Sequence, residues 1–200
     1  MTPQDGGMVA GVADRLTCES SRRLLAALER FRGPDGIIRR HAFGPEDLWP
    51  WLGGIAINQW SEQRGDYVYR LFGTHLAENL GRDLTGLTFG EWPDPVARIM
   101  RDQADLVRRT GAVVVSHYRL KVIERDGRIE DRVQTQEKVV VAIAYAAEGP
   151  PDAVLVHVDQ TRGDLSVLHA HMNATDGSCW CVAGGPVDEG CPIAPRPRSA

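Results

Sequence analysis

The stretch Tyr69–Phe89, YRLFGTHLAENLGRDLTGLTF, decides the fold. Its first residues continue an alternation of side chains that is typical of a half-buried strand. Gly73 ends that strand, and Thr74 can cap a short helix because its hydroxyl accepts a hydrogen bond from a free backbone N–H. Gly81 ends the helix where a left-handed residue is favourable, and the polar loop after it turns at Gly86. The stretch therefore predicts a strand, a tight turn, one short helix and a structured loop.

This stretch also resembles a known family. The string YRLFGTHLAENLGRDLTG, with its GT turn and its GRDLTG loop, is similar to a segment of the small PAS-like proteins common in alphaproteobacteria. The likeness extends over residues 35–160. The resemblance implies a stand-alone sensory or ligand-binding domain, in which five antiparallel strands cradle a cavity beneath helices. It implies no catalytic residues.

Hydrophobic patterns predict the other elements. Helices are expected over residues 17–32 and between Trp92 and Gly111, and strands over residues 55–60, 66–72, 112–124, 130–145 and 153–158. Strands separated by a helical block are typical of an α+β fold. We therefore predict a PAS-like five-stranded antiparallel sheet with helices on one face, an N-terminal helix and an irregular C-terminal tail.

The chain divides into three expected regions. Residues 1–33 form a leader and a helix, residues 34–163 the PAS-like domain, and residues 164–200 a flexible tail that contains Cys and His. The leading helix either packs on the sheet or pairs with its copy in a dimer. Apolar side chains in the loop over residues 34–53 are expected to anchor that loop against the sheet. Prolines and glycines in the tail argue against a strand there.

Charge and hydropathy exclude several classes of partner. The net charge is −4 and the pI is near 5.9, so no basic field is available to bind a phosphate backbone. The most apolar run, Val139–Ala147, is too short to cross a bilayer as a helix. The N-terminus lacks a positively charged leader. We expect a cytoplasmic protein that contacts neither nucleic acid nor membrane.

The predicted strand over residues 130–145 has polar residues on its apolar face. A carboxylate on a buried face is costly unless it is paired, so Glu137 either lines a ligand cavity or returns to solvent at a bulge. Gln136 and Lys138 alternate with it and are expected to face water. If Glu137 lines a cavity, residues of the neighbouring strand and of the Tyr69–Phe89 segment are expected to line it too. The candidate cavity residues are Tyr69, His75, Ser116, Tyr118, Thr135 and Glu137.

The tail holds a possible metal site. Two imidazoles and three thiols lie close together in the sequence and could supply four tetrahedral ligands to zinc. Two residues usually separate paired zinc-binding cysteines, and here only one does, so chance clustering is the alternative. The candidate metal ligands are His169, His171, Cys179, Cys181 and Cys191.

Common catalytic motifs are missing from the sequence. It contains no GxSxG, GxxxxGK[ST], HExxH or GxGxxG string, so we predict that the protein is not an enzyme. The leading hypothesis is a sensory domain that binds an unidentified small molecule and signals through a partner protein or a homodimer. The sequence specifies no cofactor. The alternatives are a zinc or redox module that uses the tail, and a small enzyme on an α+β cone fold.

Overall fold

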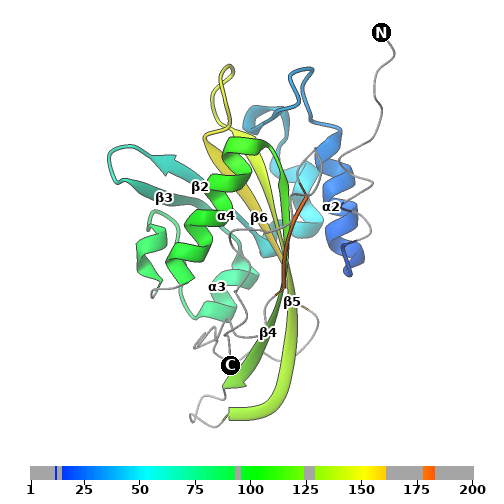
Figure 1. Cartoon of the computed structure of the whole chain (residues 1–200), viewed down its shortest axis with the longest axis vertical. Coiled ribbons are helices and arrows are strands. Elements are labelled where there is room, and N and C mark those ends of the chain that lie inside the picture. The colour runs from blue at the N-terminus through cyan, green and yellow to red at the C-terminus, as the bar shows by residue number, and fades with distance from the viewer. Residues whose placement is uncertain (1–11, 13–14, 93–95, 124–128, 161–177, 183–200) are drawn as a thin grey trace, which may run out of the picture.

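A computed structural model describes residues 12, 15–92, 96–123, 129–160 and 178–182 (Figure 1). The α-helices are α2 (Glu19–Glu29), α3 (Thr74–Leu80) and α4 (Val96–Thr110). The 3-10 helices are η1 (Arg40–Ala42), η2 (Pro45–Gly54) and η3 (Phe89–Glu91). The strands are β1 (Ile38–Arg39), β2 (Ile55–Ser61), β3 (Asp66–Phe72), β4 (Val113–Ile123), β5 (Ile129–Ala144), β6 (Ala153–Gln160) and β7 (Ser178–Val182).

The strands form one sheet in the order β3-β2-β6-β5-β4-β7, and every pair of neighbours is antiparallel. The five predicted strands are β2 to β6, so the predicted antiparallel sheet is confirmed. Two further strands were not predicted: β1 pairs with β5 in parallel, and β7 pairs with β4 at the sheet edge. The strand β7 lies in the segment predicted to be irregular. The glycines and prolines around its five residues hid the signal of a short edge strand.

The helices that follow β3 lie on one face of the sheet, as predicted, and the separately predicted N-terminal helix covers the other face. Helices α3 and α4 lie on one side and α2 on the other (Figure 1). The sequence carries the reason, because consecutive residues of both parities are buried in Val113–Val115 and Val139–Ala144. Strands that are buried on both faces read as continuous apolar runs rather than as alternating ones.

The two faces have separate apolar clusters. The leucines of helix α2 pack against the sheet and against η2. Within this chain, the leading helix therefore packs on the sheet. The segment over residues 34–53 forms η1 and η2 rather than a loop, and it is anchored there through Phe43, Leu48 and Trp51, whereas Trp49 is exposed. The first cluster includes Leu24, Leu28, Leu48, Trp51, Ile55, Val139 and Ile143. The second cluster, under α3 and α4, includes Tyr67, Tyr69, Leu76, Phe89, Ala104, Val107, Val140 and Val154.

The Tyr69–Phe89 segment has the predicted shape, with one correction at the start of its helix. Gly73 is the N-cap residue and Thr74 is the first helical residue, and no side chain caps this end. A Cβ atom on Gly73 would lie 2.4 Å from the carbonyl oxygens of Leu52 and Gly53, so the chain passes directly against η2 at this point. Gly81 ends the helix with a left-handed φ of 75°.

The loop after α3 returns to the strand that precedes it. The backbone N–H of Tyr69 donates to the carbonyl of Leu87 at 3.0 Å, and the N–H of Gly86 donates to the carbonyl of Tyr69 at 2.8 Å. Within the loop, Asp83 accepts hydrogen bonds from the backbone N–H and the hydroxyl of Thr85 at 2.8 and 2.7 Å. The GRDLTG string is therefore a turn that is pinned to β3 by backbone hydrogen bonds.

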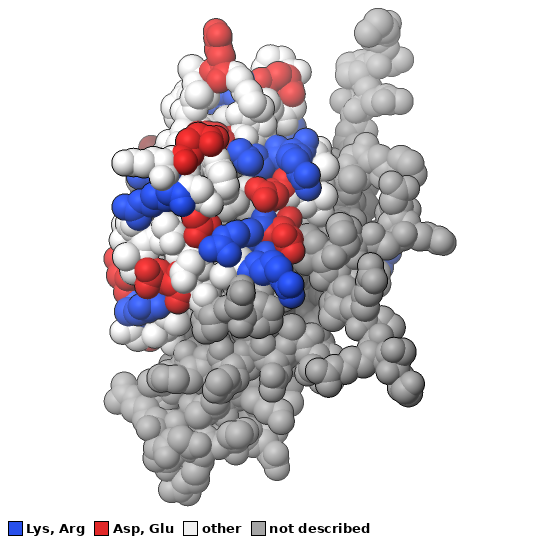
Figure 2. Space-filling view, turned by 60° about the vertical axis from the view of Figure 1, so that its left-hand side comes forward, with Lys and Arg blue, Asp and Glu red and all other residues white. Residues whose placement is uncertain are grey.

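The described surface carries charges of both signs. On the side that lies at the left of Figure 1, Lys and Arg are interspersed with Asp and Glu (Figure 2). None of the helices in the described ranges combines the length and the apolarity needed to cross a bilayer.

Candidate functional site: a cavity between the sheet and helices α3 and α4

A cavity of about 150 Å³ lies between the sheet and the layer formed by α3, η3 and α4. Strands β2, β3, β5 and β6 contribute its floor, and most of its lining is apolar. The apolar lining includes Phe72, Leu76, Leu80, Phe89, Met100 and Val156. Residues from both ends of the Tyr69–Phe89 segment are among them, so this segment forms part of the cavity wall.

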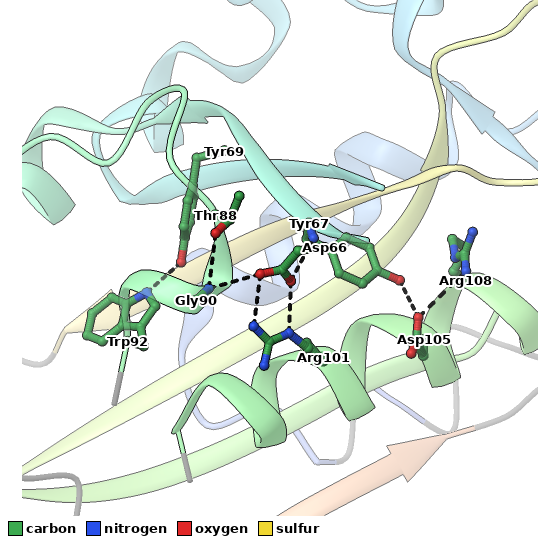
Figure 3. A network of polar contacts seen from close by, with 9 residues as sticks. All are labelled: Asp66, Tyr67, Tyr69, Thr88, Gly90, Trp92, Arg101, Asp105 and Arg108. Carbon is green, nitrogen blue, oxygen red and sulfur yellow. Dashed lines mark hydrogen bonds and ion pairs between the residues drawn. The ribbon is translucent and has the colours of Figure 1, made fainter. Parts of the chain in front are cut away.

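Aromatic rings form one wall of the cavity. The ring centroid of Tyr69 lies 5.3 Å from that of Phe72 and 5.4 Å from that of Phe89, both in edge-to-face arrangements. The indole N–H of Trp92 donates to the Tyr69 hydroxyl at 2.8 Å (Figure 3). Burial raises the pKa of Tyr69 and outweighs this hydrogen bond. The side chain is therefore a neutral phenol that presents an apolar ring to the cavity.

An ion pair fixes α4 and η3 to β3 beside the cavity. The Asp66 carboxylate accepts two hydrogen bonds from the guanidinium of Arg101, both at 2.8 Å, and another from the backbone N–H of Gly90 at 2.9 Å (Figure 3). Burial alone would raise the pKa of Asp66, but the hydrogen bonds from Arg101, Gly90 and the N–H of Tyr67 lower it below its usual value. Bidentate pairs of this kind constrain geometry as well as distance.

A second contact holds α4 one turn further along. The Tyr67 hydroxyl donates to the carboxylate of Asp105 at 2.7 Å, and the same carboxylate lies 3.6 Å from the Arg108 guanidinium (Figure 3). That guanidinium lies 5.3 Å from the centre of the Trp60 ring. Burial and the hydrogen bond to Asp105 raise the pKa of Tyr67. The helix above the cavity is thus attached to β3 at two points.

A few polar residues interrupt the apolar lining, among them Asn58, Gln103, Gln136 and Lys138. The expectation that Gln136 and Lys138 face water was wrong, because α4 covers the face on which they lie. Gln103 donates through Nε2 to the Ser116 hydroxyl at 2.9 Å. Asn58 is 1% exposed, and neither atom of its amide has a hydrogen-bond partner among the described residues. Sequence reasoning missed it, although an asparagine inside the apolar strand IAINQW is a usable signal.

The family model described as PAS domain matches residues 16–133, more than half of the chain. This chain belongs to the PAS domain family. The resemblance stated from the Tyr69–Phe89 segment is thereby confirmed at the level of the family. Domains of this family are generally sensory. No curated protein and no solved structure matches the chain.

The six candidate cavity residues are dispersed in this PAS domain. Tyr69 lines the cavity, and Ser116 lies behind it as the partner of Gln103. His75 lies outside it, in a second cavity described below. The backbones of Tyr118 and Thr135 belong to β4 and β5, and their side chains fall outside what the structure describes.

Glu137 neither lines the cavity of the PAS domain nor reaches solvent, so both predicted alternatives were wrong. It is 1% exposed on the opposite face, where it accepts hydrogen bonds from the backbone N–H and the hydroxyl of Thr17 at 2.6 and 2.8 Å. The N–H of Cys18 lies 3.3 Å from the same carboxylate oxygen. The strand register explains the error, because Ser116 pairs with Lys138 rather than with Glu137. Shifting a pairing by one residue exchanges the two faces of a strand.

A second, more polar cavity of about 320 Å³ lies on the other side of α3 and contains His75, His157 and Asp159. His157 is 3% exposed, and its Nδ1 lies 3.4 Å from the Ser21 hydroxyl. Burial lowers the pKa of His157, against the opposing charges of Asp159 and Glu137. His157 is therefore a buried histidine held within the sheet.

The predicted metal ligands are mostly beyond the described residues. Cys179 and Cys181 lie on β7, of which only the backbone is described, and His169, His171 and Cys191 lie outside the described ranges. Among the described residues, no three His, Cys, Asp or Glu side chains are grouped so that they could hold a metal ion. The zinc hypothesis therefore stays a prediction.

Proposed function

We propose that this PAS domain is a sensor that binds a small molecule in the cavity beneath α3 and α4. The cavity itself is the observation that supports the proposal. It has the size of a small ligand, its wall is aromatic and aliphatic, and a few polar groups point into it. Cavities with this composition are typical of small-molecule sites.

We infer that the output is a change in protein–protein contact, with a partner signalling protein or with a second copy of the chain. Helix α3 supplies Leu76 and Leu80 to the cavity wall and packs on η2 through its N-terminus. The η2 residue Trp51 donates its indole N–H to the carbonyl of Ser20 in α2 at 3.0 Å. Packing thus runs without interruption from the cavity through α3 and η2 to α2.

The physical mechanism that we propose is a shift of population. A ligand that fits the cavity better in one arrangement of α3 stabilises that arrangement. Because α3 rests on η2 and η2 on α2, the surface offered by α2 changes with it. The described residues that line the cavity include no Asp, Glu or His, so they supply no carboxylate or imidazole for acid–base chemistry. This lining favours binding over catalysis.

Native mass spectrometry of the protein purified from its own cells tests this proposal. The expected result is a chain that carries one small organic molecule, which is lost on denaturation, together with the number of subunits. A spectrum in which the chain carries only a metal ion would instead support the zinc or redox module. A bare chain that also binds no added small molecule would contradict the sensor.

A further inference from the structure

Asn58 is a buried polar residue that lines the cavity. It lies on β2, and both its Nδ2 and its Oδ1 lack hydrogen bonds within the described residues. Buried polar groups are nearly always satisfied, and leaving one unsatisfied costs about 1–3 kcal/mol. A group retained at such a cost needs an explanation, and a ligand that completes its hydrogen bonds supplies one.

The alternation of β2 places this amide at the cavity, because Ala56 and Asn58 line it while Ile55 and Ile57 belong to the cluster on the other face. The neighbouring strand β3 has a bulge at this level: Ile57 pairs with Leu71 and Asn58 with Tyr69, so Arg70 is the extra residue. The cross-strand neighbours of Asn58 are Tyr69 on β3 and Val154 on β6, and both also line the cavity. The amide therefore lies among aromatic and aliphatic side chains and faces the cavity.

The chemistry of the amide defines a complementary ligand. Asn58 offers a donor and an acceptor on neighbouring atoms, so its complement carries an acceptor beside a donor. A primary carboxamide and a ring lactam both have this arrangement. The cavity volume of about 150 Å³ equals that of an engineered cavity that accommodates benzene. The ligand is thus about one ring in size.

We propose that Asn58 is the polar anchor of the cavity and selects a neutral, one-ring ligand that carries a carboxamide or a lactam. This inference rests on the proposed function and specifies the class of molecule that the sensor binds. An isolated carboxylate is expensive to bury in an apolar cavity, which favours a neutral group. Lys138 also lines the cavity, so an anionic ligand is the competing outcome.

The test compares benzamide, toluene and benzoate as probes of the full chain, with dissociation constants measured by NMR titration. The variants are Asn58→Leu, the smaller Asn58→Ala, and Val156→Ala as a control that alters the apolar lining alone. From wild type to Asn58→Leu or Asn58→Ala, the ratio of benzamide to toluene affinity should fall about tenfold. The control should leave that ratio unchanged. Without ligand, Asn58→Leu should raise the melting temperature, because two unsatisfied groups leave the interior.

The other outcomes contradict the role of Asn58, the neutral class of ligand, or the proposed function. An unchanged ratio in both Asn58 variants shows that the amide does not contact the ligand and is satisfied by trapped water alone. Tighter binding of benzoate than of benzamide to the wild type overturns the neutral class. A lower melting temperature of both Asn58 variants together with an unchanged ratio assigns Asn58 a structural role. In these cases the cavity still binds probes and the proposed function stands, whereas a wild type that binds no probe overturns both.

Discussion

The Asp66 carboxylate stabilises the cavity without entering it. It joins three elements, because it lies on β3, pairs with Arg101 of α4 and accepts the backbone N–H of Gly90 in η3. Its side chain is 9% exposed and that of Arg101 34% exposed, so solvent screens this pair only partly. The layer that covers the cavity is therefore held by a charge-assisted contact at its rim.

Replacing Asp66 by Asn should lower the free energy of unfolding at pH 7 by about 2 kcal/mol, because hydrogen bonds to a charged group are lost. The pKa of Asp66 is lowered in the fold from 3.8, so its contribution is fully present above that value and is lost as the pH falls through the folded pKa. Urea unfolding of the two proteins from pH 7 downward measures this. The difference between them should shrink below about pH 4.

The control is Glu91→Gln, which breaks an exposed ion pair between η3 and Arg82. Exposed pairs contribute about 0–1 kcal/mol, so this variant should change stability little. A difference between wild type and Asp66→Asn that stays constant down to the lowest pH would show that the charge of Asp66 contributes nothing.

The sequence predicts some of the residues at the cavity and misses others, for a physical reason. Tyr69 could be predicted because its place in a strand, beside a glycine turn, is a local property. Asn58 could be noticed as a polar residue inside an apolar strand, but neither its role nor that of Asp66 could be predicted, because both roles depend on residues that lie far along the chain. Residue type alone does not distinguish an aspartate that ends a strand from one that also holds a helix in place through an ion pair.

The N-terminus of α2 is held by a side chain from a distant strand. Glu137 of β5 accepts hydrogen bonds from Thr17 and from the N–H of Cys18, directly before the helix begins. A carboxylate at a helix N-terminus interacts favourably with the free N–H groups and with the helix dipole. Burial, and then the charges of Glu137 and Asp159, raise the pKa of Cys18 to about 11. One carboxylate therefore affects both the helix and the thiol next to it.

Replacing Glu137 by Gln should lower the free energy of unfolding by about 2 kcal/mol, because the charged acceptor is removed from a buried site. The same change should lower the pKa of Cys18 below about 11, so that iodoacetamide alkylates the thiol faster at a fixed mildly alkaline pH. Chemical unfolding and alkylation rates measure the two effects. Glu19→Gln, at an exposed carboxylate of the same helix end, should change stability by less than about 1 kcal/mol. Unchanged alkylation in Glu137→Gln would contradict this electrostatic role.

The elements themselves were largely predictable, and their faces were not. The 3.6-residue and two-residue periods locate α2, α3, α4 and the strands β2 to β6. The face of each strand depends on register across the β4–β5 hairpin and on which layers lie above and below. Val139 and Val140 are both buried, so the pattern holds no single apolar face from which to choose. The erroneous placement of Glu137 followed from this ambiguity.

At the scale of the whole molecule, the sheet separates two different environments. One face is filled by α2 and η2, and the other leaves a cavity beneath α3 and α4. Helix α3 also contacts the second, polar cavity, so it stands between both. The sequence predicted the antiparallel sheet and the wall segment. It could not predict that the leading helix covers the second face, because a helix with one apolar stripe fits a sheet or a copy of itself equally well.

A ligand that fills the cavity should alter α3 and, through η2, α2. Hydrogen exchange followed by mass spectrometry, with and without saturating benzamide or the molecule retained by the native protein, measures this directly. With the ligand bound, we expect slower exchange in the Tyr69–Phe89 segment and a changed exchange rate in α2. Identical exchange in both elements, at a ligand concentration that saturates binding, would contradict this expectation.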